Sequence, residues 1–174
     1  MSATAKDLLS VAARAKIERE TTKYPPEQRQ SAVMSALAIA QDEHGWLSNE
    51  VMEEVATYLG MPPVWVYEVA TFYNMYVLKK QGRHKVVICT NLPCALSGAV
   101  EAGEHLQKKL GVGGYNETSV DGAVTLKEGE CFGACGDAPV LIVDNKRMCS
   151  RMSNDKLDQL VAELTVTPAK AGAQ

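Results

Sequence analysis

The stretch KVVICTNLPCALSG at residues 85–98 joins a strand signal, a cysteine-bearing loop and the start of a helix. KVVIC at 85–89 is a β-branched run that ends in a cysteine, and it predicts a short buried strand. The loop TNLPCALSG follows, and residues 98–110 predict a helix with Ala102, Leu106 and Leu110 on its apolar face. The stretch therefore forms the first two elements of a strand–helix–strand unit.

The rest of this unit lies downstream. AVTLKEGEC at residues 123–131 predicts a second strand, which again ends in a cysteine. Two strands joined by a helix pair in parallel through a right-handed crossover. Residues 139–144 and 146–150 then predict a hairpin that turns near Asp144, and Ser153 caps a last helix. The order β-α-β-β-β-α resembles the thioredoxin-like fold.

The first eighty residues have helical periodicity instead. The predicted helices are a weaker one over 5–20, one over 27–44 that starts at a proline pair, one that Asn49 caps and Gly60 ends, and one from Pro62 to Val77. Short connections between such helices favour a small antiparallel bundle. We therefore expect an α+β protein, with a helical bundle over 1–80, a thioredoxin-like domain over 81–165 and a flexible tail over 166–174.

Composition excludes several classes of protein. The 174 residues carry a net charge of −3, which argues against a nucleic-acid or polybasic membrane surface. No apolar run reaches the ~18 residues that a membrane span needs, and MSATAKDLLS lacks the features of a signal peptide. We expect a cytosolic protein. In a reducing compartment its five cysteines, all between Cys89 and Cys149, favour metal or redox chemistry over disulfides.

Four of the cysteines form two spaced pairs. Four residues separate Cys89 from Cys94, three separate Cys131 from Cys135, and 36 residues lie between the pairs. Each pair begins at the end of a predicted strand. If the two strands are adjacent and parallel, both loops emerge at the same end of the sheet and the four thiolates converge.

Four thiolates are the usual ligand set of a 2Fe–2S cluster. Structural zinc commonly uses closer cysteine spacing, so the sequence favours the cluster, with a zinc-binding interaction module as the rival. A redox C-x-x-C pair is absent from the sequence. Neither loop contains lysine or arginine, so we expect backbone N–H groups and the side chains of Thr90, Asn91 and Ser97 to stabilise the cluster's negative charge.

Three further features have an ordinary structural interpretation beside a functional one. Cys149 stands alone in a predicted strand, where a small core residue is the simpler interpretation. The aromatic residues of the fourth helix are expected to be mostly core, with Tyr76 as a candidate anchor for a partner protein. Pro139 lies where thioredoxin-like folds often have a cis proline, although most X–Pro bonds are trans, and the sequence leaves the isomer open.

The sequence also resembles a known family. RQSAVMSALAIAQDEHGWLS, VATYLGMPPVWVYEVATFYNMY, CTNLPCALSG and CFGACGDAP together are similar to the small 2Fe–2S subunit of bacterial respiratory complex I, the proton-translocating NADH:quinone oxidoreductase. The resemblance runs from about residue 24 to about residue 164. The family's cluster ligands correspond to Cys89, Cys94, Cys131 and Cys135, with no departure at those positions.

The resemblance implies a place in a larger enzyme. Such subunits dock on a larger subunit that carries FMN, the NADH site and a 4Fe–4S cluster, close to a large iron–sulfur subunit. They exchange one electron with the flavin, while the rest of the complex reduces quinone and pumps protons. This chain would hold one 2Fe–2S cluster, neither FMN nor NADH, and no catalytic residue of its own. It would lie on the cytoplasmic side of the membrane without inserting into it. Related NAD(P)-linked hydrogenases and formate dehydrogenases use similar subunits and remain alternatives, as does a stand-alone ferredoxin.

Overall fold

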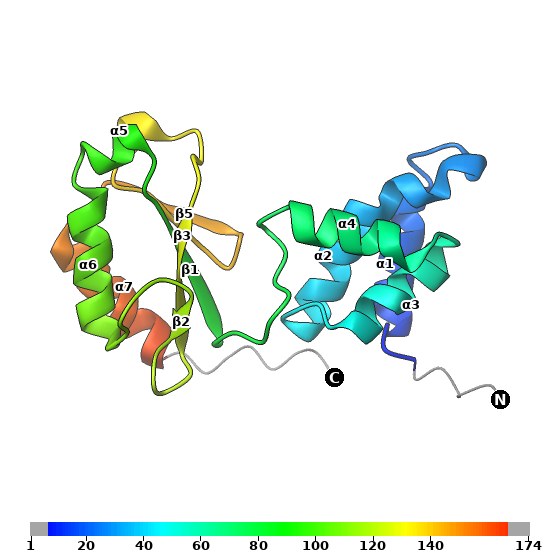
Figure 1. The fold of residues 1–174 in the computed structure, drawn as a ribbon, viewed down its shortest axis with the longest axis horizontal. Coiled ribbons are helices and arrows are strands. Elements are labelled where there is room, and N and C mark those ends of the chain that lie inside the picture. Colours follow the sequence, from blue (N-terminus) through cyan, green and yellow to red (C-terminus); the bar gives the residue numbers. More distant parts are fainter. Residues whose placement is uncertain (1–6, 167–174) are drawn as a thin grey trace. The chain divides into compact units, whose positions relative to one another are not determined.

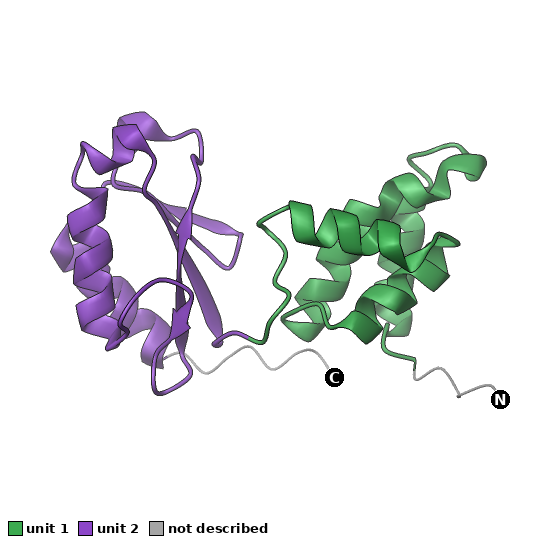
Figure 2. Cartoon of the chain, viewed as in Figure 1, with its two compact units in different colours: residues 1–80 green, residues 81–174 purple. Residues whose placement is uncertain are grey.

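A computed structural model describes residues 7–166 of the chain. The chain divides into two compact units, Met1–Lys80 and Gln81–Gln174 (Figure 2), and each unit has its own apolar core. The first residues of the predicted helix over 5–20, and nearly all of the predicted tail over 166–174, lie outside the described residues. None of the helices within 7–166 is long and apolar enough to cross a membrane.

The described part of unit 1 is built from helices (Figure 1). They are α1 (Val11–Thr21), the 3-10 helix η1 (Pro26–Ala32), α2 (Val33–His44), α3 (Asn49–Leu59) and α4 (Pro63–Phe72). Their shared core contains fully buried residues from each of the longer helices and from the loop after α2, among them Ile17, Leu37, Leu47, Val55 and Val66. Gly45 and Gly60 end α2 and α3 in the left-handed conformation that glycine adopts without a steric penalty.

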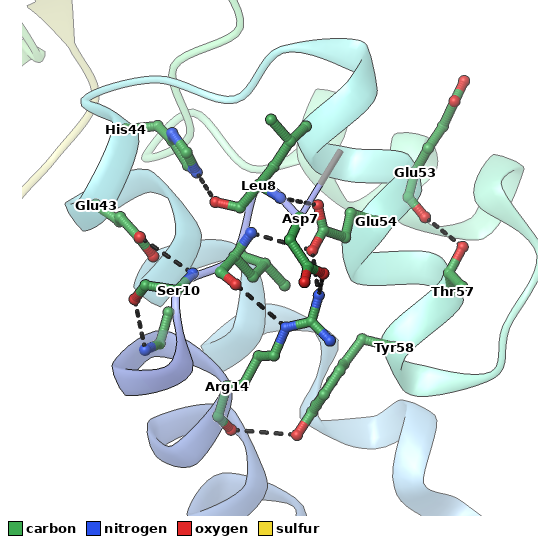
Figure 3. A network of polar contacts seen from close by, with 12 residues as sticks. Asp7, Leu8, Ser10, Arg14, Glu43, His44, Glu53, Glu54, Thr57 and Tyr58 are labelled. Carbon is green, nitrogen blue, oxygen red and sulfur yellow. Dashed lines mark hydrogen bonds and ion pairs between the residues drawn. The ribbon is translucent and has the colours of Figure 1, made fainter. Parts of the chain in front are cut away.

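Helix α1 begins later than its sequence periodicity predicts, because polar groups hold the preceding segment extended (Figure 3). The carboxylate of Glu54 accepts the N–H groups of Leu8 and Leu9 at 2.6 and 3.0 Å, and it also binds the guanidinium of Arg14 at 2.7 Å. The Ser10 hydroxyl then caps α1 by accepting the N–H of Ala13. These contacts dock the start of the described chain onto α3.

Two other helix boundaries in unit 1 also differ from the prediction. The predicted helix over 27–44 begins as the 3-10 helix η1, and its α-helical part starts only at Val33. Helix α4 ends at Phe72 rather than at Val77. The amide of Gln41 causes the second difference, since it accepts the N–H of Val77 at 2.6 Å and donates to the carbonyl of Met75 at 3.2 Å, which gives this segment partners outside a helix.

This ending of α4 corrects the interpretation of its aromatic residues. Tyr76 is only 4% exposed, and its hydroxyl donates to the carbonyl of Met34 at 2.9 Å. It is therefore a core residue, and the expectation that it anchors a partner is wrong. Phe72 and Tyr73 are 80% and 40% exposed and their rings pack in a T-shaped arrangement, so these two are not the core residues that the sequence predicted.

Unit 2 contains a five-stranded sheet in the order β2-β3-β1-β4-β5. Its strands are β1 (His84–Cys89), β2 (Glu117–Thr118), β3 (Val124–Gly129), β4 (Leu141–Val143) and β5 (Arg147–Cys149). Its helices are α5 (Leu92–Ala95), α6 (Ala99–Leu110), the 3-10 turn η2 (Cys135–Asp137) and α7 (Asn154–Val166). Strands β1 and β3 are parallel, as predicted, and the remaining pairs are antiparallel.

The two long helices of unit 2 pack on one face of this sheet (Figure 1). Alternate residues of β1 and β3 point into that core because successive side chains of a strand face opposite ways. The core joins strand residues such as Ile88 and Leu126 to Leu106 of α6 and Leu157 of α7. The predicted α+β architecture, with helices before a thioredoxin-like sheet, is confirmed.

Smaller features of unit 2 were partly predictable. The hairpin turn at Asp144 and Asn145 is confirmed: both residues have positive φ, and the N–H of Lys146 closes the turn on the carbonyl of Val143 at 3.0 Å. The short elements α5 and β2 were not predicted, because each is too short to show a periodic pattern. The peptide bond between Ala138 and Pro139 is cis.

Candidate metal centre

The first cysteine pair is buried at the end of β1. Cys89 is the last residue of the strand, where it is held between two neighbours: its N–H donates to the carbonyl of Val140 at 3.1 Å, and the parallel register places Gly129 of β3 opposite it. Cys94 lies in α5, the single turn that follows. Both side chains are buried.

The second pair is exposed and lies just beyond β3. That strand ends at Gly129, two residues earlier than predicted, and Cys131 follows in the loop. Cys135 opens the 3-10 turn η2. The two sulfur atoms are 3.7 Å apart, and the N–H of Gly133 points at Cys131 Sγ from 3.4 Å. Gly133 has φ of +75°, and this left-handed turn folds the loop back so that its N–H reaches the sulfur.

The two pairs share one electrostatic environment. Burial raises the pKa of the Cys94 thiol to about 11, with help from the hydrogen bond to Cys89 and from the charges of Cys89, Cys135 and Cys131. The pKa of Cys135 is also raised, first by its hydrogen bond to Cys131 and further by the charge of Cys89. Each of these two thiols therefore interacts electrostatically with members of the other pair.

The four cysteines are arranged as two pairs and not as one group of four around a single point. Within residues 7–166 no three Cys, His, Asp or Glu side chains are grouped closely enough to hold one metal ion. A tetrahedral structural zinc needs its four donors around one point. A 2Fe–2S cluster distributes four thiolates over two irons, so that each iron takes two. The chain offers two cysteines after each of two adjacent parallel strands, and this two-and-two division matches the donor requirement of the binuclear cluster.

The surroundings of the thiols fit an iron–sulfur cluster as well. The N–H of Gly133 is already directed at a sulfur, and such N–H···S contacts stabilise thiolate charge. A separate apolar cluster packs around the buried pair and lowers the local polarity. Its other members are mostly small: Ala99, Val140, Phe132, Ala134 and Ala138.

The polar side chains of the first loop bind other groups and not the thiols, so the prediction that they stabilise the charge of the cluster is wrong. The hydroxyl of Thr90 donates to Glu128 at 2.6 Å, and the amide of Asn91 donates to Glu130 at 2.7 Å. The hydroxyl of Ser97 donates to the carbonyl of Pro93 at 2.8 Å. Thr90 and Asn91 instead tie the first loop to β3 and to the residue just before Cys131, which holds the two loops together.

The remaining candidate ligands lie elsewhere. Cys149 is in β5 and packs against the core between the sheet and its two helices, as the simpler interpretation predicted. Each histidine is bound to another group: His44 to the carbonyl of Leu8, His84 to Asp144 and His105 to Asp158.

One charged contact at the site was not predicted from the sequence. Arg151, which follows β5, binds the carboxylate of Asp137 in the second loop at 2.8 Å. The two loops that carry the cysteine pairs contain no basic residue. Arg151 lies outside both loops in the sequence. The sequence offered one signal for this contact: Asp137 lies in a loop that would face a negatively charged cluster, so a basic partner for it could have been expected.

Comparison with known proteins agrees with this site. The sequence model of the family described as "Thioredoxin-like [2Fe-2S] ferredoxin" matches residues 17–165. The chain belongs to this family. As a thioredoxin-like ferredoxin it is an iron–sulfur protein, and the match includes all four cysteines of the two pairs.

Several curated relatives are named as components of one enzyme, NADH-quinone oxidoreductase. The ferredoxin is 47% identical over 130 residues to an E-type component of this enzyme from Rhizobium meliloti, a match that covers 75% of this chain and 76% of the relative. It is 41% identical over 143 residues to the E-type component from Rickettsia conorii, with 82% and 84% covered. Subunit 2 of the enzyme from Thermus thermophilus is 36% identical over 148 residues, with 85% and 81% covered.

A solved structure shares the fold. The crystal structure of an NAD+-reducing [NiFe]-hydrogenase in the H2-reduced state superposes with a TM-score of 0.68 at 19% identity. The match covers 78% of this ferredoxin and 22% of the much longer hydrogenase chain. At this identity the likeness is one of fold.

Proposed function

We propose that this ferredoxin is the 2Fe–2S electron-transfer subunit of NADH:quinone oxidoreductase, with Cys89, Cys94, Cys131 and Cys135 as the cluster ligands. The observation that carries the proposal is the position of the two cysteine pairs, which begin at the ends of the adjacent parallel strands β1 and β3. Relatives named as components of this enzyme, at 36 to 47% identity over most of the chain, support the assignment to this complex.

The chain's own residues have distinct roles in this proposal. The cluster, when bound, supplies reversible one-electron redox chemistry. Cys89 and Cys94 anchor it to the sheet and exclude water, since both are buried. Cys131 and Cys135 hold its outer side on an exposed loop, and this is the side at which a partner's redox group can come near. Gly133 donates its N–H to Cys131 and stabilises the thiolate there.

The partner in this proposal is the larger subunit that carries FMN, the NADH site and a 4Fe–4S cluster, with the large iron–sulfur subunit of the complex adjacent. The complex would place the chain on the cytoplasmic side of the membrane, as a peripheral subunit. Two exposed leucines flank the buried ligand Cys94, namely Leu92 and Leu96. Apolar side chains at a rim beside a redox site are suited to contact with another protein.

The bundle offers a second apolar surface for such a partner. The exposed large apolar side chains of α4 and of the residues after it are Val64, Trp65, Phe72, Tyr73 and Met75. Aromatic residues and methionine are enriched at protein interfaces. With Tyr76 assigned to the core, Phe72 is the aromatic residue most suited to this contact.

Cluster content is the first test. The purified native protein should be red-brown, should contain two irons and two sulfides per chain, and should give a rhombic signal with average g below 2 once reduced. A colourless protein that contains one zinc and no sulfide would contradict the proposal and would establish the interaction-module alternative.

The choice of complex is tested separately. Affinity purification of the full chain from its native cells should recover an FMN-containing subunit together with quinone-reducing partners. Recovery of a hydrogenase or formate dehydrogenase large subunit would redirect the assignment. Phe72→Ser and Leu96→Ser should each reduce recovery of the FMN subunit, whereas Val120→Ser, at a comparably exposed apolar residue far from both surfaces in sequence, should not.

A further inference from the structure

We infer that Arg151 is a positioning residue for the second ligand loop and that its ion pair with Asp137 sets the reduction potential of the cluster. The inference rests on the ligand set proposed above. The ion pair joins the loop that carries Cys131 and Cys135 to the segment after β5. It is separate from the four cysteine ligands that the family resemblance implies.

The contact between Arg151 and the loop is made by both side chain and backbone. The guanidinium Nε and Nη2 atoms lie 3.0 and 2.8 Å from the same oxygen, Asp137 Oδ1. The backbone N–H of Arg151 donates to the carbonyl of Asp137 at 2.8 Å. The N–H of the next residue, Met152, donates to the carbonyl of Pro139 at 3.1 Å. This segment therefore fixes the loop at two main-chain points and at one carboxylate.

The backbone conformation of Arg151 indicates that its side chain matters at this position. Its φ is +53°, a left-handed conformation in which glycine is favoured over any residue with a Cβ atom. A glycine would form the same two backbone contacts with less strain. The long cationic side chain is the part that glycine would not supply, and its contact is Asp137, two residues after Cys135.

The charges of the pair act on the cluster in opposite directions. Reduction adds one electron to the cluster and makes its net charge one unit more negative. A carboxylate nearby disfavours this step, and a guanidinium favours it. Asp137 belongs to the 3-10 turn that Cys135 opens, so its charge lies within the ligand loop itself. Arg151 neutralises that charge and keeps it from lowering the potential.

The experiment is a charge cycle on the full chain with its cluster bound. The variants are Arg151→Gln, Asp137→Asn and the double variant, and the measurement is a redox titration followed by the EPR signal of the reduced cluster. Arg151→Gln should lower the midpoint potential, Asp137→Asn should raise it, and the double variant should return close to the wild-type value. The shifts should shrink with added salt, because the two side chains are 74% and 49% exposed.

Arg147→Gln is the matched control. Arg147 forms a comparable exposed pair with Glu163 at 2.7 Å, but this pair joins β5 to α7 and holds no ligand loop. Its substitution makes the same change of charge and should shift the potential less than Arg151→Gln does.

The inference is overturned if both single variants shift the potential in the same direction, or if Arg151→Gln shifts it no more than Arg147→Gln. Either outcome would leave Arg151 with a merely structural role. Failure of the proposed function is a different result, since wild-type protein would then contain no 2Fe–2S cluster before any variant is compared.

Discussion

The two cysteine pairs hold opposite positions with respect to solvent. Cys89 and Cys94 are buried within a small apolar cluster, whereas Cys131 and Cys135 lie on an exposed loop. The first pair is built into a strand end and a helical turn, and the second depends on a left-handed glycine and on contacts from other segments. Under the proposed ligand assignment, the buried pair would anchor the cluster and the exposed pair would present it to a partner.

The largest expected effect separates the ligands from the fifth cysteine. Cys94→Ser and Cys135→Ser should each remove the visible absorption of the 2Fe–2S cluster, because a thiolate ligand is lost. Cys149→Ser should keep it, since Cys149 lies in β5 and packs against the core of the sheet. Absorption spectra with iron and sulfide analysis provide the measurement, and a fully loaded Cys135→Ser protein would contradict the ligand assignment.

The second prediction compares the reactivity of the two pairs in cluster-free protein. At pH 8 a thiol with a pKa of about 11 has roughly a hundredfold less thiolate than one at the ordinary 9.0. Only the thiolate reacts, and burial also shields Cys94 from the reagent, so Cys94 should be alkylated more slowly than the exposed Cys131. Raising the pH toward about 11 ionises Cys94 and should increase its rate.

Mass spectrometry of iodoacetamide-treated Cys149→Ser protein measures these rates without interference from the fifth thiol. Equal labelling of Cys94 and Cys131 at the lower pH would show that the first pair is not buried in the cluster-free chain.

The third prediction uses the two glycines that flank the second cysteine pair, Gly129 before Cys131 and Gly136 after Cys135. A Cβ atom on Gly129 would lie 2.5 Å from Val87 Cγ1 and 2.9 Å from the ring of Phe132, whereas one on Gly136 would meet nothing within 4 Å. Gly129→Ala should therefore lower the free energy of unfolding by ~1–3 kcal/mol through overpacking, and Gly136→Ala should leave it nearly unchanged. Chemical denaturation of both variants measures the difference. Similar values for the two would mean that the sheet accommodates the extra methyl group.

The smallest effect concerns the tie between the first loop and β3. Thr90→Val removes the hydroxyl that donates to Glu128 and should cost ~0.5–1.5 kcal/mol, as the loss of one hydrogen bond does. Ser97→Ala is the control, because Ser97 bonds only within its own turn. Amide hydrogen exchange should become faster around residue 90 in the first variant only. Unchanged exchange there would assign the stability of this loop to its backbone contacts.

Much of the fold was visible in the sequence because it depends on local patterns. The strand at 85–89 and the hairpin turn at Asp144 were predicted from β-branched residues and turn residues, and the structure contains both. The end of α4 could not be predicted in this way. It depends on the side chain of Gln41, which lies more than thirty residues earlier in the chain and binds backbone groups on both sides of Tyr76.

The site shows the same limit. Strand signals predicted that the two cysteine pairs follow adjacent parallel strands, which end at the same edge of a sheet, and the pairing of β1 with β3 confirms this part of the prediction. The partners of Thr90 and the pairing of Asp137 with Arg151 are long-range contacts between polar side chains. Such contacts leave no periodic signal in a single sequence, so they appear only when the chain is folded.

The contacts of Glu54 with the segment before α1 have a consequence for how the sequence of this protein can vary over evolution. Its carboxylate accepts main-chain N–H groups of Leu8 and Leu9, a contact that any residue except proline can provide. Leu9 is also constrained by its buried side chain, but position 8 is only partly buried. Because the Leu8 side chain also packs against the core of the bundle, neutral drift at position 8 should run among apolar residues, with proline as the substitution that selection removes.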